Sequence, residues 1–453
     1  MLIATNPYTE QQIAEYPSLT DMHIHEPIQQ AHNAFSGWRD RPYAERAQVL
    51  RNVAAELRKQ KAELAKLMAD EMGKPIKEGG PEVEKAAWCA EHYAEHAAAY
   101  LQAEVLDSDA SESYVSYEPL GAVMGILPWN APIWLAFRFI APALMAGNTC
   151  VLKHDPHVPG CAVAICKAFE AAGAPEHIVV NLPIETPDVE AAIRNTNIMA
   201  VSFTGSSGGG AKVAAIAGSE IKHSVLELGG SDPFIVMADA DIEKAMDTAT
   251  LSRIINAGQS CIAAKRILVE EGIYEAFIEG VMTRLEALKM GDPNDMSTDI
   301  GPLARRDLQQ NLHRQVEQSI AAGAVCLLGG KLPVGEGFFY PPTLLTNVNP
   351  DMPVFCEETF GPVMVVIPVE NVDQAVELAN QSEYGLGASL WMADSEQAKA
   401  VAKRLFTGQV AINGIVKTDP RLPSGGVKRS GYGRELGPHG IKEFVNAKQV
   451  WVK

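Results

Sequence analysis

A cysteine and a glutamate occupy the two positions of the chain best suited to covalent chemistry. Cys261 lies between a Gly-Gln-Ser turn and a short apolar run that leads into the strand-like residues 267–269, so its thiol is expected at the end of a loop that a ligand can reach. Glu227 ends another strand-like run. A nucleophilic thiol needs a second group to finish covalent chemistry, and a carboxylate that activates water is one solution. The pair therefore suggests a nucleophile and a general base.

Further motifs follow strand-like runs and could supply an oxyanion donor and a cofactor bed. Asn130 carries an amide that can donate to a developing oxyanion, although alone it reads better as a turn residue. The glycine-rich residues 203–210 open a helix whose N-terminus can attract a pyrophosphate, although such turns are often only tight connections. Lys153 ends a strand where it can meet a ribose or a phosphate, or simply be solvated. Glu358 lies in an acidic turn, with a surface charge pair as its alternative.

The elements that must position these residues form two α/β units. Apolar strand-like runs alternate with helical stretches between residues 121 and 230, and the alternation starts again after residue 230. Continuous apolar strands separated by helices predict parallel sheets covered on both faces. The expected strands lie near 122–126, 149–153, 178–181, 200–203 and 224–226, and then near 234–237, 266–269, 364–367 and 410–413.

The regions outside these units have simpler patterns. Residues 27–68 predict two amphipathic helices broken near 38–42. Residues 79–81, Gly-Gly-Pro, are expected to interrupt the chain before an alanine-rich helix at 82–101. Residues 114–118 and 445–453 alternate like exposed strands and could pair with each other.

Length, charge and cysteine usage limit the class of protein. With 453 residues, 47% of them hydrophobic, the chain is expected to form two or three globular domains. A net charge of −18 argues against nucleic acid or an anionic membrane as the main partner. Seven cysteines without a C-x-x-C pair, and an N-terminus without a signal pattern, predict a cytoplasmic location. The apolar residues 121–147 contain three prolines and an arginine, which favours a buried strand-loop-helix over a membrane span.

Six motifs, in their order and spacing, make the chain similar to the NAD(P)-dependent aldehyde dehydrogenase superfamily. Each motif alone is weak, but six in order are specific, and the resemblance runs from about residue 27 to the end. It implies an α/β fold with a Rossmann-like cofactor domain, an α/β catalytic domain and a small bridging β oligomerisation element. The motifs are residues 128–130, 203–206, 227–230, 258–261, 358–362 and 425–431.

With this resemblance, the cofactor-binding domain is expected in residues 1–101 and 120–229 and the catalytic domain in 230–424. The bridging element would comprise residues 102–119 and 425–453. The resemblance implies a homodimer or homotetramer assembled through the strands of that element.

The resemblance also implies roles for the three candidate catalytic residues. Cys261 would attack the aldehyde to give a thiohemiacetal, with the oxyanion held by Asn130 and the backbone N–H of Cys261. Hydride transfer to the nicotinamide would leave a thioester, and water activated by Glu227 would hydrolyse it. The presence of this glutamate indicates a free acid as product and not transfer to coenzyme A.

Several residues would hold the cofactor. The resemblance implies Lys153 at the adenosine ribose, Gly205 and Ser206 at the pyrophosphate, Trp129 beside the groove, Glu358 at the nicotinamide ribose and Phe360 near the ring. Many members have a glutamate where this chain has Pro156. That glutamate would accept from a ribose 2′-OH and repel a 2′-phosphate, whereas proline does neither. NAD and NADP therefore both stay open, and we lean to NAD with some use of NADP.

The substrate positions are most similar to the succinate-semialdehyde dehydrogenase branch. Arg138, eight residues after Asn130, matches an arginine that binds the distal carboxylate. An arginine in an apolar run is costly unless paired; a substrate carboxylate could be its partner, and a structural salt bridge is the alternative. Trp134 would wall the pocket and Thr418 would lie near the carboxylate, but Ile255 stands where some members have a second arginine. Succinic semialdehyde is the expected substrate, with another short aldehyde as the alternative.

Other classes of function are disfavoured by particular residues. A thiol hydrolase that uses Cys261 and Glu227 without a redox cofactor would not need the second α/β unit or the glycine-rich turn. A binding protein that kept the fold without the chemistry would not need Cys261, Glu227 and Asn130 intact. His92 and His96 stand at i and i+4 but lack a third ligand with matching spacing, so no metal site is predicted.

Overall fold

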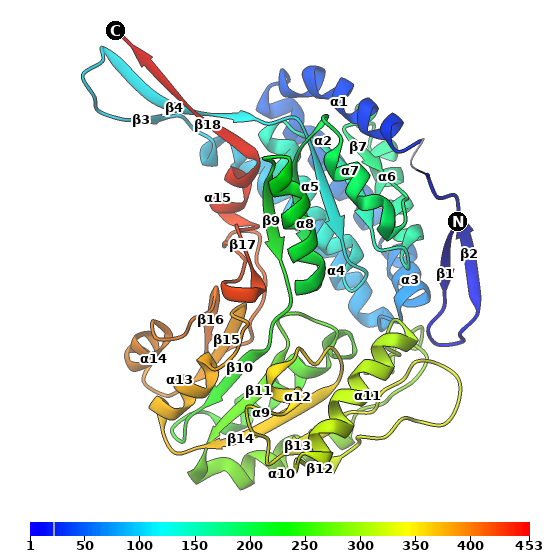
Figure 1. The fold of residues 1–453 in the computed structure, drawn as a ribbon, viewed down its shortest axis with the longest axis vertical. Helices are drawn as coiled ribbons and strands as arrows, with labels where there is room; N and C mark the ends of the chain where they lie inside the picture. Colours follow the sequence, from blue (N-terminus) through cyan, green and yellow to red (C-terminus); the bar gives the residue numbers. More distant parts are fainter. Residues whose placement is uncertain (21–22) are drawn as a thin grey trace.

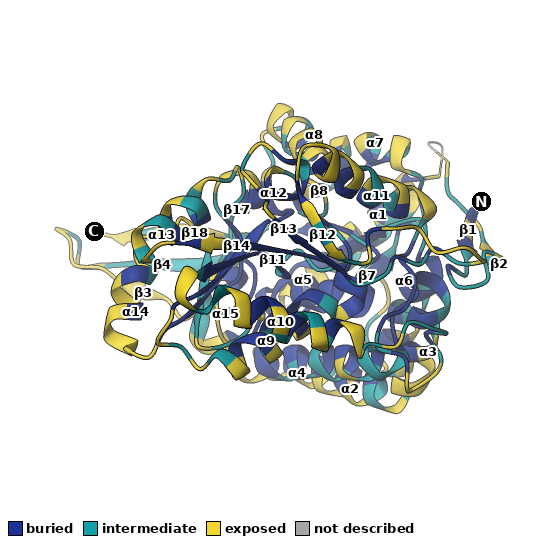
Figure 2. Ribbon diagram, turned by 90° about the horizontal axis from the view of Figure 1, so that it is seen from below, coloured by how far each residue is buried: buried dark blue, intermediate teal, exposed yellow. Residues whose placement is uncertain are grey.

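Two large β-sheets, one above the other in Figure 1, organise the fold, and a smaller three-stranded sheet projects from the body. The computed structural model describes residues 1–20 and 23–453. Figure 2 shows why the large sheets form the core: most of their strands are buried, whereas many of the helices around them are exposed on their outer faces.

The upper sheet confirms the predicted parallel unit. Its strand order is β17-β9-β8-β5-β6-β7, and only β17 is antiparallel to its neighbour. The strands are β5 (Ala122–Leu127), β6 (Thr149–His154), β7 (Val179–Asn181), β8 (Ile198–Thr204), β9 (His223–Glu227) and β17 (Gly431–Tyr432). The intervening helices are α5 (Pro132–Ala146), α6 (Pro159–Ala171), α7 (Val189–Arg194) and α8 (Ser207–Ser219). Every residue of α5 is buried, which explains its apolar composition, and no helix of the described residues is long and apolar enough to cross a membrane.

The lower sheet is the predicted second unit, with more strands than expected. Its order is β12-β13-β14-β11-β10-β15-β16, and all pairs are parallel except β12 with β13. The strands are β10 (Asp232–Val236), β11 (Ala264–Glu270), β12 (Val325–Leu328), β13 (Thr343–Thr346), β14 (Val363–Val369), β15 (Gly387–Trp391) and β16 (Gln409–Ile412). Its helices are α9 (Ile242–Ile254), α10 (Tyr274–Glu286), α11 (Arg306–Ala321), α12 (Pro353–Cys356), α13 (Val372–Asn380) and α14 (Ser395–Ala402). The sequence reading missed β12, β13 and β15.

The N-terminal region corrects two predictions. A hairpin of β1 (Leu2–Thr5) and β2 (Gln12–Tyr16) precedes four helices, α1 (His25–Arg39), α2 (Tyr43–Lys59), α3 (Lys61–Met72) and α4 (Ile76–Tyr100). Residues 27–68 thus contribute to three helices and not two. The interruption expected at 79–81 was wrong, because α4 runs through it. A Cβ on Gly79 would lie 2.8 Å from the Ala65 backbone, so this glycine permits close helix packing instead of ending the helix.

The predicted pairing of the two exposed strands is confirmed. β18 (Val445–Val452) runs antiparallel to β4 (Glu112–Pro119) along its whole length, and β3 (Glu104–Val105) covers the other edge of β4. We call this sheet the arm; it stands out from the body in Figure 1. Residues 425–453 are not one element, because β17 belongs to the upper sheet and the short helix α15 (Gly437–Gly440) lies between β17 and the arm.

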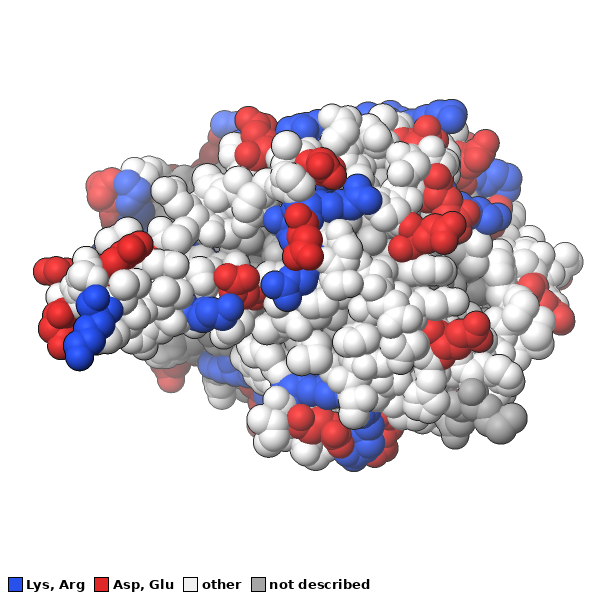
Figure 3. All heavy atoms as spheres, turned by 90° about the horizontal axis from the view of Figure 1, so that it is seen from above, with Lys and Arg blue, Asp and Glu red and all other residues white. Residues whose placement is uncertain are grey.

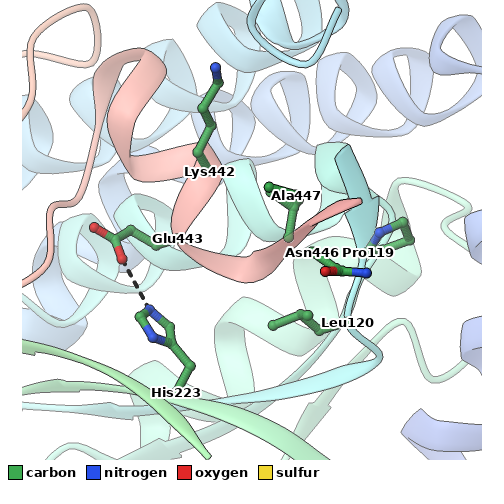
Figure 4. A pocket seen from close by; sticks show the side chains of 8 residues that line it. Pro119, Leu120, His223, Lys442, Glu443, Asn446 and Ala447 are labelled. Carbon is green, nitrogen blue, oxygen red and sulfur yellow. Dashed lines mark hydrogen bonds and ion pairs between the residues drawn. The ribbon is translucent and has the colours of Figure 1, made fainter. Parts of the chain in front are cut away.

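A surface pocket lies at the root of the arm, with an ion pair of 3.0 Å between His223 and Glu443 at its side (Figure 4). None of the predicted site residues is among its described lining residues, which are Pro119, Leu120, His223, Lys442, Glu443, Val445, Asn446 and Ala447. On the face seen in Figure 3, acidic and basic side chains are interspersed among broad uncharged areas.

Candidate active site

The predicted site residues of the upper sheet meet at one edge. β6 and β7 extend from one side of β5, and β8 and β9 extend from the other. In open α/β sheets, ligands bind outside the carboxyl ends of the strands at such a reversal of strand order. Trp129 and Asn130 follow β5, Lys153 lies near the end of β6, Gly205 follows β8 and Glu227 ends β9. The topology therefore gathers all five at this switch point.

The lower sheet supplies its residues from the amino ends of three adjacent strands. Gly230 precedes β10, Cys261 precedes β11 and Glu358 precedes β14. A Cβ on Gly230 would lie 2.8 Å from the carbonyl oxygen of Cys261, and Gly230 donates its N–H to Glu358 Oε1 at 3.0 Å. The carboxyl edge of one sheet and the amino edge of the other thus enclose the site.

The loop before Cys261 has an uncommon backbone conformation. Asn256, Ala257 and Gly258 have φ values of 55°, 53° and 75°. Non-glycine residues in this left-handed region cost about 1–3 kcal/mol each, so surrounding structure must stabilise them. A side chain at position 258 would overlap the backbone of Gly361, which explains the glycine there.

A set of hydrogen bonds stabilises this loop and ties it to Asn130. Asn256 donates its N–H to Glu78 on α4 at 2.8 Å and its Nδ2 to the Asn130 carbonyl at 2.8 Å. Asn130 in turn donates from Nδ2 to the Gln259 carbonyl at 3.0 Å. That is the only acceptor of the Asn130 amide within the described chain, so its second N–H has no partner among the described residues. The orientation predicted for an oxyanion donor is therefore fixed by the loop that carries the thiol.

Two fully buried cations that the sequence reading missed hold the same loop. Lys265 Nζ donates to the carbonyls of Ser260 at 2.9 Å and Cys261 at 2.7 Å. Arg253 Nη2 donates to the carbonyls of Gly258 at 2.7 Å and Thr359 at 3.4 Å, which joins the thiol loop to the loop before β14. Their positions beside apolar runs could have indicated buried cations. The carbonyl groups that they bind could not be predicted, because these partners are brought together only by tertiary contacts.

The surroundings of Cys261 favour its thiol form over the thiolate. Burial raises its pKa to about 11, while the nearby positive charges of Lys265 and Arg138 act in the opposite direction. The thiolate is the reactive form of cysteine, so catalysis needs a base or a bound group that shifts this equilibrium.

Arg138 already has partners within the protein, so the cost of burying its charge does not require a substrate carboxylate. Its Nη2 lies 3.2 Å from Glu227 Oε2 and also pairs with Glu435, and all three side chains are at most 6% exposed. We expected a substrate carboxylate to be the partner of Arg138, but two protein carboxylates take that place. The geometry favours the structural salt bridge that the sequence left as the alternative.

Glu227 is fixed by this pairing. Burial raises its pKa, Arg138 opposes the shift, and Glu435 adds to it. Its Oε1 has no hydrogen-bond partner among the described residues, although it is buried. An unpaired carboxylate oxygen in a buried site is suited to accept a proton from a water molecule.

The residues predicted at the nicotinamide end lie together. Glu358 accepts the Gly230 N–H and lies 3.7 Å from Lys265 Nζ. A Cβ at Gly229 would overlap the Glu358 carboxylate, so a larger residue there would displace this side chain. Trp129 and Phe360 pack edge to face, with ring centroids 5.8 Å apart. Trp129 from the upper sheet and Glu358 and Phe360 from the lower sheet therefore line the same side of the site.

The residues predicted at the adenosine end fit a phosphate-bearing ligand. The Lys153 side chain is 4% exposed, and within residues 1–20 and 23–453 its ammonium has no hydrogen bond or ion pair. Burial lowers its pKa. Ser206 caps α8 by accepting the Gly209 N–H at 3.2 Å. Gly208, in the first turn of this helix, faces open space. Pro156 follows β6 closely and is half-buried. Asp155 and Glu185 act on Lys153 electrostatically, but neither forms a direct ion pair with it, so this buried cation and the open helix N-terminus both favour an anion.

The predicted substrate residues lie beside a lysine that the sequence reading did not single out. Thr418 Oγ1 accepts a hydrogen bond from Lys85 Nζ at 2.7 Å. The same ammonium lies 4.4 Å from the centroid of the Trp134 ring. Ile255 is 37% exposed and directly precedes Asn256 of the thiol loop.

The two histidines of α4 form an aromatic cluster. His92 contacts the Tyr100 hydroxyl at 3.1 Å, and its ring centroid lies 4.6 Å from that of His96. Among the described residues no group of three or more His, Cys, Asp or Glu side chains is arranged to hold a metal ion.

Comparison with known proteins agrees with this geometry. The model of the Aldehyde dehydrogenase family matches residues 2–450. A Synechocystis protein named probable succinate-semialdehyde dehydrogenase, NADP(+), is 46% identical and covers 100% of both chains. An Escherichia coli succinate semialdehyde dehydrogenase, NAD(P)+, is 44% identical over 99% of this chain and 97% of its own.

A solved structure extends the comparison. The crystal structure of succinic semialdehyde dehydrogenase from Streptococcus pyogenes in complex with NADP+ superposes with a TM-score of 0.97 at 34% identity, covering 100% of both chains. The overall fold is therefore shared along the whole chain.

Proposed function

Since the chain belongs to the aldehyde dehydrogenase family, we propose that it oxidises succinic semialdehyde to succinate with NADP+, releasing NADPH and a proton. Two observations support this chemistry: Asn130 is hydrogen-bonded to Gln259 of the loop that carries Cys261, and Cys261 and Glu227 both act electrostatically on the same buried arginine, Arg138. The substrate rests on the names of the full-length relatives at 46% and 44% identity.

The first step is addition of Cys261 to the aldehyde. The thiol loses its proton to water, Sγ bonds to the carbonyl carbon, and the carbonyl electron pair moves to oxygen. The free N–H of Asn130 Nδ2 and the backbone N–H of Cys261 donate to that oxyanion. Because Asn130 is already held by Gln259, its amide loses little freedom when the charge develops.

The second step is hydrolysis of the thioester. A bound cofactor would accept, at its nicotinamide, the hydride whose loss turns the aldehyde adduct into this thioester. Glu227 Oε1 then accepts a proton from water while the water oxygen bonds to the thioester carbon and Sγ leaves as thiolate. Arg138 holds Oε2, so it leaves the unpartnered Oε1 as the base.

The structure fits a dinucleotide on the upper sheet. Lys153 would contact the adenosine ribose, the backbone at Gly205 and Ser206 the pyrophosphate, and Glu358 the nicotinamide ribose, with Trp129 and Phe360 beside the ring. The support is the unpaired buried ammonium of Lys153 and the open start of α8.

We propose NADP+ as the preferred cofactor, in place of the NAD that the sequence analysis favoured. Two of the relatives compared above carry NADP in their names, and these names give no support to an NAD preference. In the site, Pro156 places no carboxylate against a 2′-phosphate, and the neighbouring Asp155 is engaged by His157 at 2.7 Å. Lys153 remains as the positive charge available to that phosphate.

We also propose a cytoplasmic homodimer or homotetramer joined through the arm. The support is the exposed apolar surface of the arm, where Val105 is 83% and Trp451 46% exposed, and its two open strand edges. All seven cysteines are free, which fits a reducing compartment.

Initial rates of NADPH and NADH formation test the proposal. We expect a strong preference for succinic over glutaric semialdehyde, acetaldehyde and butyraldehyde, faster rates with NADP+ than with NAD+, and no activity in Cys261→Ala. Equal rates on all aldehydes would refute the substrate, and activity in the cysteine variant would refute the mechanism.

A further inference from the structure

We propose that Lys85, on α4, binds the distal carboxylate of the substrate; the inference rests on the proposed semialdehyde activity. Its ammonium donates to Thr418 Oγ1 at 2.7 Å and lies over the Trp134 ring at 4.4 Å. Both partners are buried and both were predicted to line the substrate pocket. Lys85 itself is half-buried and lines a surface pocket together with Trp88, so its side chain is not closed off from solvent.

Lys85 is a cation without a protein counter-ion. It has no ion pair with any of the residues that the structure describes, and its single hydrogen bond to Thr418 leaves two N–H groups. A lysine ammonium that is largely withdrawn from water favours an anionic partner. Burial and the facing charge of Arg138 lower its pKa to about 8, which reflects this missing partner.

The acidic groups around Lys85 are already committed to others. Glu82 pairs with Lys74 through Oε2 and accepts the N–H groups of Ile133 and Trp134 through Oε1. Asp419 is held by Arg421 at 2.7 Å. The facing titratable groups are therefore Arg138 on α5, Asp419 beyond Thr418, and Glu82 and Cys89 on α4 itself.

Arg138 is a poor alternative anchor. Glu227 and Glu435 both pair with its Nη2, so a substrate carboxylate that approached the remaining N–H groups of the guanidinium would also meet these two buried negative charges. Ile255 offers no charge at the position where a second arginine was considered. Lys85 is thus the one unpaired cation beside Trp134 and Thr418 among the described residues.

Lys85 is held at a fixed place relative to the reacting carbonyl. Glu82, one turn before it on α4, accepts the first N–H groups of α5 at 3.0 and 3.1 Å. Asn130, the proposed oxyanion donor, lies two residues before α5 begins. These hydrogen bonds between α4 and α5 fix the distance from the Lys85 ammonium to Asn130. A substrate whose aldehyde and carboxylate are separated by a matching number of carbon atoms is therefore favoured.

The test compares succinic semialdehyde with butyraldehyde, which has the same number of carbons and no carboxylate. In Lys85→Met, the ratio of the two kcat/KM values should fall about 10- to 100-fold, because a hydrogen-bonded ion pair with the substrate is lost. The loss should be in KM for the semialdehyde more than in kcat. Lys85→Arg should keep most of the preference. Lys77→Met is the matched control: it removes a lysine of the same helix that is paired with Asp299 at 2.6 Å, and should leave the ratio unchanged.

The outcomes separate this inference from the proposed function. A wild-type enzyme that prefers succinic semialdehyde, with the same preference in Lys85→Met, would overturn the role of Lys85 alone. A wild-type enzyme without that preference would overturn the proposed substrate and the inference with it. Equal loss on both aldehydes in Lys85→Met would assign a structural role. The pH profile gives a second readout: in wild type the ratio should fall as the pH rises through about 8, and this limb should disappear in Lys85→Met.

Discussion

Replacing Arg138 by methionine should destabilise the protein and lower activity on charged and uncharged aldehydes alike. Methionine has a side chain of similar length but no charge, so the change leaves Glu227 and Glu435 facing each other in a buried site. If Arg138 is structural, both substrates suffer because the general base is misplaced. If it anchors the substrate, only succinic semialdehyde suffers.

The size of the effect follows from the burial of the three groups. Removing one partner of a buried ion pair costs about 3–5 kcal/mol, because an uncompensated charge remains. With an m-value of about 3 kcal/mol/M, the urea midpoint should fall by about 1–2 M. Arg138→Met combined with Glu435→Gln should recover most of this loss, since a single carboxyl with a raised pKa can stay protonated.

The loss should also grow with pH. Burial raises the pKa of Glu227, and Arg138 holds the shift back, so the variant raises this pKa further. A group whose folded pKa is raised gives its full stability below the unfolded pKa and loses it as the pH rises through the folded pKa. The urea midpoint should therefore fall more at about pH 8.5 than at about pH 6.

The assay is urea unfolding at both pH values together with kcat/KM for succinic semialdehyde and butyraldehyde. The two kcat/KM values should fall by factors that agree within about threefold. An unchanged urea midpoint, or a loss confined to the semialdehyde, would refute the reasoning and return Arg138 to the substrate site.

Three further predictions address the chemistry and the cofactor. Glu227→Gln should give a burst of NADPH followed by turnover slowed about 10²- to 10⁴-fold, and undiminished steady turnover would argue against the general base. Because burial raises the pKa of Cys261 to about 11, iodoacetamide should modify the cofactor-free enzyme about ten times faster per pH unit between about pH 7 and about pH 9. A plateau near neutral pH would contradict this. Lys153→Met should raise the KM for NADP+ by about tenfold or more, unlike exposed Lys167→Met; equal values would exclude Lys153 from the cofactor site.

Much of the architecture could be predicted from the sequence because its signals are local. The alternation of apolar runs with helices predicted both parallel sheets, because the pattern of buried and exposed residues along each element is visible in neighbouring residues. β15, with its small residues, lacks a strong strand signal, and Gly79 resembles a helix breaker until Ala65 is seen packed against it. These errors arose where tertiary packing overrides local propensity.

The candidate catalytic residues were identifiable for a different reason. The resemblance of six motifs, in order, to the aldehyde dehydrogenase superfamily named them without coordinates, and their roles stay predictions. The partners of these residues were not identifiable, because nothing near Cys261 in the sequence says that Lys265 binds its carbonyl or that Asn130 is fixed by Gln259.

The sequence by itself thus predicted the two α/β units and, through the family resemblance, the candidate catalytic residues, whereas the strand order that forms the switch point came from the structure. Only the tertiary structure decided which charges are paired. Arg138 is neutralised by Glu435, which lies almost three hundred positions further along the chain, and Lys85 meets Thr418 across a separation of 333 residues while keeping no counter-ion. Electrostatic partnership depends on distance in space, and the pattern of neighbouring residues does not contain that distance.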